Sequence, residues 1–124
     1  MIDFKNGSII KLTVTNETGP AQDVQPLLVK NETIIRTYKS VRDYVMFTNK
    51  RIIAVNVQGI TGKKKDFTSL PYSRIQVFSI ETSGHFDLDS ELELYFSSIG
   101  KIKFEFVGNC NIADIGKIIG TFIL

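Results

Sequence analysis

The feature that most constrains the fold is a series of short segments rich in Val, Ile, Phe, Tyr and Thr, which begins at residue 33. Segments of this kind between turn signals are typical of antiparallel β domains. The chain has 124 residues, enough for one core of ordinary size and too few for two. We therefore predict one β domain with seven strands, over residues 33–39, 43–48, 51–57, 63–69, 74–82, 90–97 and 101–107.

Side-chain alternation predicts a register for the last hairpin, "ELELYF" with "KIKFEF". Directly opposed residues of antiparallel strands point to the same face of the sheet. Pairing Phe96 with Ile102 satisfies this rule and places Gly100 where the loop needs a left-handed residue. The same register sets Glu93 opposite Glu105, an unfavourable pair of like charges.

The hairpin "YVMFTNKRIIAV" is apolar on both faces. Its predicted turn is Asn49 and Lys50, because Asn tolerates a positive φ better than most residues. One face carries Tyr44, Met46, Ile53 and Val55, and the other carries Val45, Phe47, Ile52 and Ala54. Neither face should be fully solvated, so a further element is expected to cover the second one.

A C-terminal helix is one candidate for this cover. Asn109 or Asn111 can serve as its N-cap. Its apolar stripe consists of Ile112, Ile115, Ile118, Ile119 and Phe122. Gly116 and Gly120 favour close packing of this helix on strands over a membrane dimer motif, since the apolar end of the chain is too short to span a bilayer.

The phrases FTNKR, QGITGKK, PYSRI and SIETSG follow one another along the chain before the closing helix. Together they resemble the small bacterial pleckstrin homology (PH) domain proteins. The resemblance implies a mainly β (α+β) fold, a bent seven-stranded antiparallel barrel capped by a C-terminal helix, over residues 32–124. Residues 1–31 then form an N-terminal extension, in which "SIIKLTVTN" is predicted to be an extra strand that completes a sheet edge of this or another subunit.

The resemblance also implies a non-enzymatic module that assembles into a closed ring, a cyclic homo-oligomer, and binds an unidentified protein partner. Polar residues within the strands are candidates for the surfaces between neighbouring copies, and the alternative is an ordinary outer face with cross-strand pairs. These residues are Arg42, Asp43, Lys50, Arg51, Gln58, Lys63, Lys64, Tyr72, Ser73, Glu81 and Thr82.

The stretch "VQGITGKKKD" raises the question of phosphate binding. A P-loop needs four residues between its glycines and a final Ser or Thr, whereas only two residues separate Gly59 from Gly62 here and Lys64 takes the hydroxyl position. We read the stretch as a hairpin tip. On a strand, Lys63 and Lys65 face one side and Lys64 the other. Weak binding of anionic lipid head groups by such basic tips is the alternative function.

The acidic stretch "HFDLDSELE" suggests a metal site, but a calcium loop counted from Asp87 would have Leu92 and Ser98 where it needs Gly and Glu. His85 lacks an orienting partner for catalysis. We expect no metal, no cofactor and no catalytic residue. A net charge of +2 argues against nucleic acid. The single Cys110 and an N-terminus without a secretory pattern favour the cytoplasm.

Overall fold

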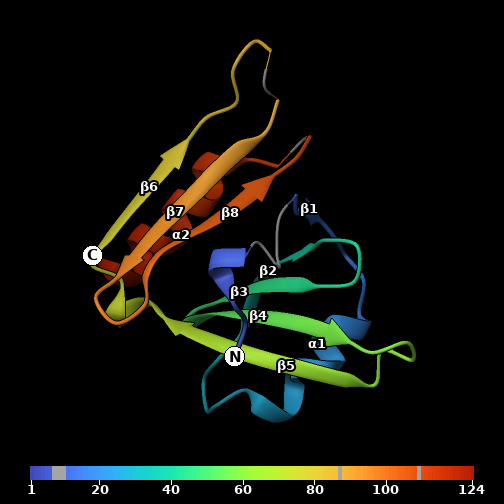
Figure 1. The fold of residues 1–124 in the computed structure, drawn as a ribbon. Coiled ribbons are helices and arrows are strands. Elements are labelled where there is room, and N and C mark those ends of the chain that lie inside the picture. Colours follow the sequence, from blue (N-terminus) through green and yellow to red (C-terminus); the bar gives the residue numbers. More distant parts are fainter. Residues whose placement is uncertain (7–10, 87, 109) are drawn as a thin grey trace.

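A computed structural model describes residues 1–6, 11–86, 88–108 and 110–124. The chain forms a five-stranded antiparallel sheet in the order β1-β2-β3-β4-β5 and a three-stranded sheet in the order β6-β7-β8 (Figure 1). The strands are β1 (Thr13–Val14), β2 (Ile34–Lys39), β3 (Tyr44–Thr48), β4 (Arg51–Gln58), β5 (Lys64–Pro71), β6 (Val77–Glu81), β7 (Ser90–Phe96) and β8 (Gly100–Phe106). The helices are η1 (Phe4–Asn6), α1 (Gly19–Val24), η2 (Gln25–Leu27), η3 (Tyr72–Arg74) and α2 (Ile112–Ile123). The predicted seven strands and C-terminal helix are confirmed, with the sheets bent rather than closed.

The N-terminal segment joins the two sheets at one corner. β1 pairs with β2 and so extends the five-stranded sheet. Just before it, Leu12 forms a parallel bridge to Phe106 of β8. The Leu12 N–H donates to the Glu105 carbonyl at 2.7 Å, and the Val107 N–H donates to the Leu12 carbonyl at 2.9 Å. The edge that β1 completes therefore belongs to its own subunit.

The β3–β4 turn contains Asn49 and Lys50, as predicted, but the positive φ on which the prediction rested is absent. Neither residue has a positive φ. The turn is held instead by Thr48, whose Oγ1 accepts a hydrogen bond from the Lys50 N–H at 3.0 Å. The Asn49 side chain accepts from the Thr33 N–H at 2.9 Å and donates to the Asn31 carbonyl at 2.8 Å. Asn49 thus anchors the preceding segment to the turn.

The register predicted for the β7–β8 hairpin is wrong by two residues. Phe96 pairs with Gly100, and Glu93 faces Lys103 instead of Glu105. A slip of two residues leaves every side chain on its predicted face, so the inward set is correct. Gly100 has a φ of +84°, which confirms the left-handed residue at this turn.

Each face of the β3–β4 hairpin has its own cover. On one face, Met46, Ile53 and Val55 pack with Val24 of α1 in a small separate core. The other face carries Val45, Phe47, Ile52 and Ala54, and these residues share the main core with Ile115 of α2, so the C-terminal helix lies on the face for which it was predicted as a candidate cover. The helix follows β8 of the other sheet, which packs on the inner face of the five-stranded sheet, and α2 therefore reaches only that side.

The N-cap of α2 is Asn111, whose side chain accepts a hydrogen bond from the Asp114 N–H at 3.2 Å. The alternative cap, Asn109, lies outside the described residues. The apolar stripe is buried at Ile112, Ile115, Ile118 and Ile119. Phe122 is partly exposed and stacks on Tyr72, with 5.7 Å between the ring centroids.

The two helix glycines differ in their surroundings. A Cβ on Gly116 would lie 3.2 Å from the Cδ1 of Ile80 in β6, which confirms close packing on a strand. A Cβ on Gly120 would meet only Leu124, at 3.8 Å, so the packing prediction is wrong for this residue.

Candidate functional site

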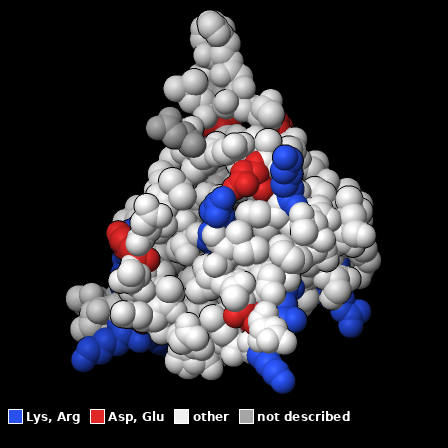
Figure 2. Space-filling model, turned by 180° about the vertical axis from the view of Figure 1, so that it is seen from behind, with Lys and Arg blue, Asp and Glu red and all other residues white. Residues whose placement is uncertain are grey.

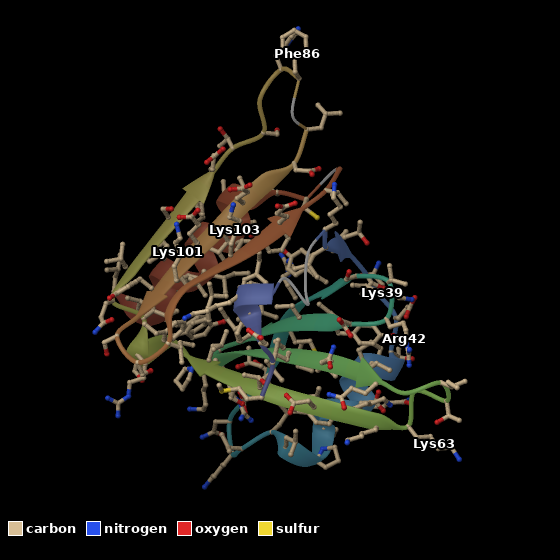
Figure 3. The ribbon with its side chains drawn as sticks, viewed as in Figure 1. Lys39, Arg42, Lys63, Phe86, Lys101 and Lys103 are labelled. Atoms are coloured by element: carbon tan, nitrogen blue, oxygen red, sulfur yellow. The ribbon has the colours of Figure 1, made fainter. Side chains whose placement is uncertain are left out.

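The structure places the eleven predicted polar residues in three separate groups. The first, where the β2–β3 and β4–β5 loops meet, contains Arg42, Asp43, Gln58, Lys63 and Lys64. The second, at the other end of β4 and β5, contains Lys50, Arg51, Tyr72 and Ser73. The third, at the end of β6, contains Glu81 and Thr82. Figure 3 shows Arg42 and Lys63 at the loop end of the five-stranded sheet, far from Phe86. The residues do not form one continuous site in a single copy.

Two polar residues of the first group hold the loops together. The Arg42 guanidinium donates to the Gly59 carbonyl. The Asp43 carboxylate accepts from the Val57 N–H at 2.9 Å. Gln58 is also engaged, since its amide donates to Asn56 Oδ1 at 3.0 Å. These three side chains stabilise the hairpin and its neighbouring loop.

The β4–β5 tip is a glycine turn, as predicted. Gly59 and Gly62 have φ values of +74° and +69°. Lys63 and Lys64 follow the turn and are exposed. Ile60, between the glycines, is fully exposed.

Other lysines at this end of the molecule form ion pairs with the N-terminal segment. Lys65 Nζ lies 2.9 Å from an oxygen of Asp23 in α1. Lys39 Nζ lies 3.0 Å from an oxygen of Glu17, and this hydrogen bond raises the pKa of Lys39. On the face seen in Figure 2, Lys and Arg occur in separate groups rather than in one continuous basic surface.

Arg51, in the second group, belongs to an internal network. The Glu32 side chain is fully buried, and Arg51 donates to both of its oxygens at 2.9 Å. Thr48 Oγ1 donates to the same carboxylate at 2.7 Å. Arg51 also donates to the Leu27 carbonyl at 2.8 Å. The network fastens the N-terminal segment to the β3–β4 hairpin.

Tyr72 is also used internally. Its ring is buried, and its hydroxyl donates to the Thr48 carbonyl at 2.7 Å. Burial raises the pKa of this hydroxyl. Lys50 and Ser73 are exposed. Ser73 lines a polar pocket of about 390 Å³ together with Arg74 and Ser97.

The β6 strand and the connection that follows it form a surface that sequence reasoning missed. β6 is the outer strand of its sheet, and Val77 on it is 61% exposed. Beyond β6 the chain projects from the molecule (Figures 1 and 3). Phe86 and Leu88, which we call the β6–β7 tip, are 98% and 68% exposed. The sequence did contain a signal for this surface: two apolar residues stand in a connection where polar and small residues are usual.

A second pocket lies at the far end of the three-stranded sheet. It has a volume of about 530 Å³ and is lined by residues 1–5 and 98–102. We call it the N-terminal pocket. Ile2 at its wall is buried, and the Phe4 ring packs edge-on against Phe104 with 6.0 Å between centroids.

Within the part of the chain that the structure describes, no group of three or more His, Cys, Asp or Glu side chains could hold a metal ion. His85 is exposed and contacts the Phe86 ring, while Asp87 lies outside the described residues. Burial raises the pKa of the Cys110 thiol, which argues against a reactive thiolate. None of the helices in the described ranges is long and apolar enough to cross a membrane.

Two bent antiparallel sheets with a C-terminal helix define the PH-like class of fold. The chain belongs to the bacterial PH domain family, whose sequence pattern matches residues 3–123. This match includes most of residues 1–31, which also contribute Ile2, Leu12 and Val24 to the two cores.

Relatives match along most of their length. The Bacillus subtilis (strain 168) protein YjqA is 37% identical over 120 residues, covering 95% of this chain and 96% of YjqA. YozO of the same organism is 34% identical over 99 residues, covering 80% and 85%. A DUF1696 family protein with a pleckstrin homology domain from Shewanella loihica PV-4 has a similar crystal structure, with a TM-score of 0.80, 36% identity, and coverage of 92% of this chain and 98% of that one. A pleckstrin homology domain from Shewanella amazonensis SB2B gives a TM-score of 0.67 at 37% identity, covering 89% and 90%.

Proposed function

We propose that this protein is a non-enzymatic PH-like interaction module that assembles with copies of itself into a closed ring and binds a protein partner in the cytoplasm. The observation that carries the proposal is the outer edge of β6. Among the described residues this strand pairs only with β7. Unpaired N–H and C=O groups on a sheet edge are a template for another strand.

Of the four outer strands, β1 and β8 meet at the Leu12–Phe106 bridge, and β5 and β6 differ in how their edges are protected. β5 begins with Lys64 and Lys65 and ends with Pro71, which are residues that discourage strand addition. The amino terminus also lies against it, since the Met1 amino group is 2.8 Å from an oxygen of Asp66 and the Ile2 N–H donates to Thr68 Oγ1 at 3.1 Å.

β6 has no comparable protection. Its sequence, "VFSIE", contains neither Lys nor Pro. Val77 is exposed beside the partly exposed ring of Tyr95, its partner in β7. An exposed edge with apolar side chains and a single charge, Glu81 at its end, favours contact with a second protein chain, and the simplest such chain is another copy.

Light scattering on the purified protein tests this proposal. We expect a mass above that of the monomer at micromolar concentration. Val77→Lys places a charge on the β6 edge and should lower the mass. Val41→Lys introduces the same charge at an exposed valine in the β2–β3 loop and should leave the mass unchanged. A monomeric wild type contradicts the ring.

The partner is tested by affinity capture from the native cytosol. A partner that binds the assembly should be retained by the wild type and by Val41→Lys and lost with Val77→Lys. Equal capture by all three proteins contradicts binding through the ring, since it would show that a single copy is sufficient.

Binding of anionic lipid is the second candidate, and the β4–β5 tip is the observation that favours it. Exposed Lys63 and Lys64 lie next to the fully exposed Ile60, a combination suited to a membrane surface. Flotation with anionic vesicles should show binding that Lys63→Glu with Lys64→Glu abolishes. Lys30→Glu with Lys117→Glu makes the same charge change at two exposed lysines away from this tip and is the control. Equal flotation with neutral vesicles eliminates this function.

A further inference from the structure

The β6–β7 tip and the N-terminal pocket lie at opposite ends of the three-stranded sheet. β7 begins at Ser90, close to the tip, and ends at Phe96, close to the β7–β8 turn that lines the pocket. In Figure 1 the tip is at the top and this turn is at the lower end of the sheet. At about 3.3 Å per residue, β7 alone separates them by roughly 20 Å. A tip therefore cannot enter the pocket of its own copy.

The tip has an apolar end. Phe86 is far more exposed than the other exposed aromatic residues of the described chain, Tyr95 and Phe122, at 98% against 46% and 38%. Leu88 adds a second apolar side chain to the same projection. Side chains of this kind are commonly buried against a partner when they gather on a protruding segment.

The pocket has the size and lining to receive such side chains. Its volume of about 530 Å³ lies within the range of roughly 300–1,000 Å³ that is usual for ligand sites. Ile2, Phe4, Ile99 and Ile102 give it apolar walls. The pocket opens between the first residues of the chain and the β7–β8 turn.

The charges of the two ends are complementary. From residue 75 to residue 100 the chain contains five acidic residues and neither Lys nor Arg. Within the copy, Asp89 lies 3.5 Å from Lys11, Glu91 lies 3.6 Å from Lys103 and Glu93 lies 3.9 Å from Lys101, so only part of this negative charge is left for a neighbouring copy. Acidic side chains gather at the base of the projection at the top of Figure 2. The pocket is lined by Lys5 and Lys101, with Asp3 as its one acidic member. The Met1 amino group is paired with Asp66 and Lys101 with Glu93, so Lys5 supplies the positive charge that is available to an acidic tip. Opposite charges of this kind orient one copy relative to the next.

We propose that Phe86 and Leu88 of one copy insert into the N-terminal pocket of the next copy. This inference rests on the proposed self-assembly and specifies a contact within it. The contact is head to tail, because the two surfaces differ and each copy carries both. A head-to-tail contact closes into a ring when the rotation between copies allows it.

Two variants test the contact: one blocks the tip and the other blocks the pocket. Phe86→Ser removes the apolar tip at an exposed position, so the fold should be unaffected. Ile99→Asp places a negative charge at the wall of the pocket, facing an acidic tip. Each variant alone should show a lower mass than the wild type in light scattering at the same micromolar concentration. Ile60→Ser removes an equally exposed apolar residue at the β4–β5 tip and should keep the wild-type mass.

Mixing the two variants gives the decisive result. The intact tip of Ile99→Asp fits the intact pocket of Phe86→Ser, so the mixture should form a heterodimer that cannot grow further. A wild-type mass for Phe86→Ser, or a mixture that forms no heterodimer, overturns the inference. If Val77→Lys still lowers the mass in that case, the proposed assembly stands without this contact. A monomeric wild type removes both the assembly and the contact.

Discussion

Replacing Arg51 with Met tests whether the network around Glu32 holds the N-terminal segment to the sheet. The Glu32 side chain is fully buried, and Arg51 is its only cationic partner among the described residues. Breaking a buried ion pair by removing one partner costs about 3–5 kcal/mol. Because Arg51 is itself 20% exposed, water can reach part of the site. We therefore expect a loss of about 2–4 kcal/mol in the free energy of unfolding.

The assay is urea unfolding at one fixed protein concentration, since assembly would add to the apparent stability. For a chain of this length the melting temperature should also fall by roughly 3–5 °C per kcal/mol. Combining Arg51→Met with Glu32→Leu removes the buried carboxylate that Arg51→Met leaves without a cationic partner. The double variant should regain much of the lost free energy of unfolding. A loss below about 0.5 kcal/mol for Arg51→Met, the level of an exposed ion pair, would refute the reasoning.

The same network predicts a pH dependence. Burial by itself raises the pKa of the Glu32 carboxyl, but the hydrogen bonds from Arg51, Thr48 and the Val29 N–H together outweigh it, and the pKa lies below its ordinary value of 4.5. Ionised Glu32 therefore stabilises the fold above pH 4.5, and this stabilisation is lost as the pH falls through the folded-state pKa. The difference in the free energy of unfolding between wild type and Glu32→Gln should shrink as the pH falls from 4.5 through the folded-state pKa of Glu32. A difference that stays constant would contradict the assignment.

Three further substitutions test other parts of the fold by urea unfolding. Val24→Ala should lower the free energy of unfolding by about 1–3 kcal/mol, because Val24 of α1 fills the small core. A loss near zero would mean that α1 does not contribute to the stability of the fold. Gly62→Ala should cost about 1–2 kcal/mol at its φ of +69°, while Gly19→Ala, with open space around its Cβ, should be nearly neutral. Asn111→Ala should cost about 0.5–2 kcal/mol, and Asn111→Asp should retain most of the cap; equal losses would argue against capping.

The sequence predicted the strands, the glycine turn and the inward faces because these depend on local composition and alternation. It missed the β7–β8 register because a slip of two residues changes no face, so alternation cannot detect it. The cover of Met46 and Val55 by α1 was not predicted, for a related reason. Apolar patterning shows that a face is buried but does not identify what buries it, and α1 is too short to give a strong helical signal.

The role of the candidate site residues stays a prediction, but the structure shows intramolecular bonds for several of them that the sequence did not indicate. Arg51, Asp43 and Tyr72 looked like surface candidates because they are polar or end a strand, whereas each is bonded inside the protein. Their partners, such as the Glu32 carboxylate, come from distant parts of the chain, and a single sequence does not show such pairings. Phe86 lies in the acidic stretch "HFDLDSELE", where its local sequence does not show that the side chain is exposed.

The measurement that tests the central claim most directly is native mass spectrometry of the wild-type protein over a range of concentrations. A closed ring predicts one discrete mass, a fixed multiple of the 14.0 kDa chain, that stays the same as concentration rises. A mass of 14.0 kDa throughout, or a series of masses that lengthens with concentration, would contradict it.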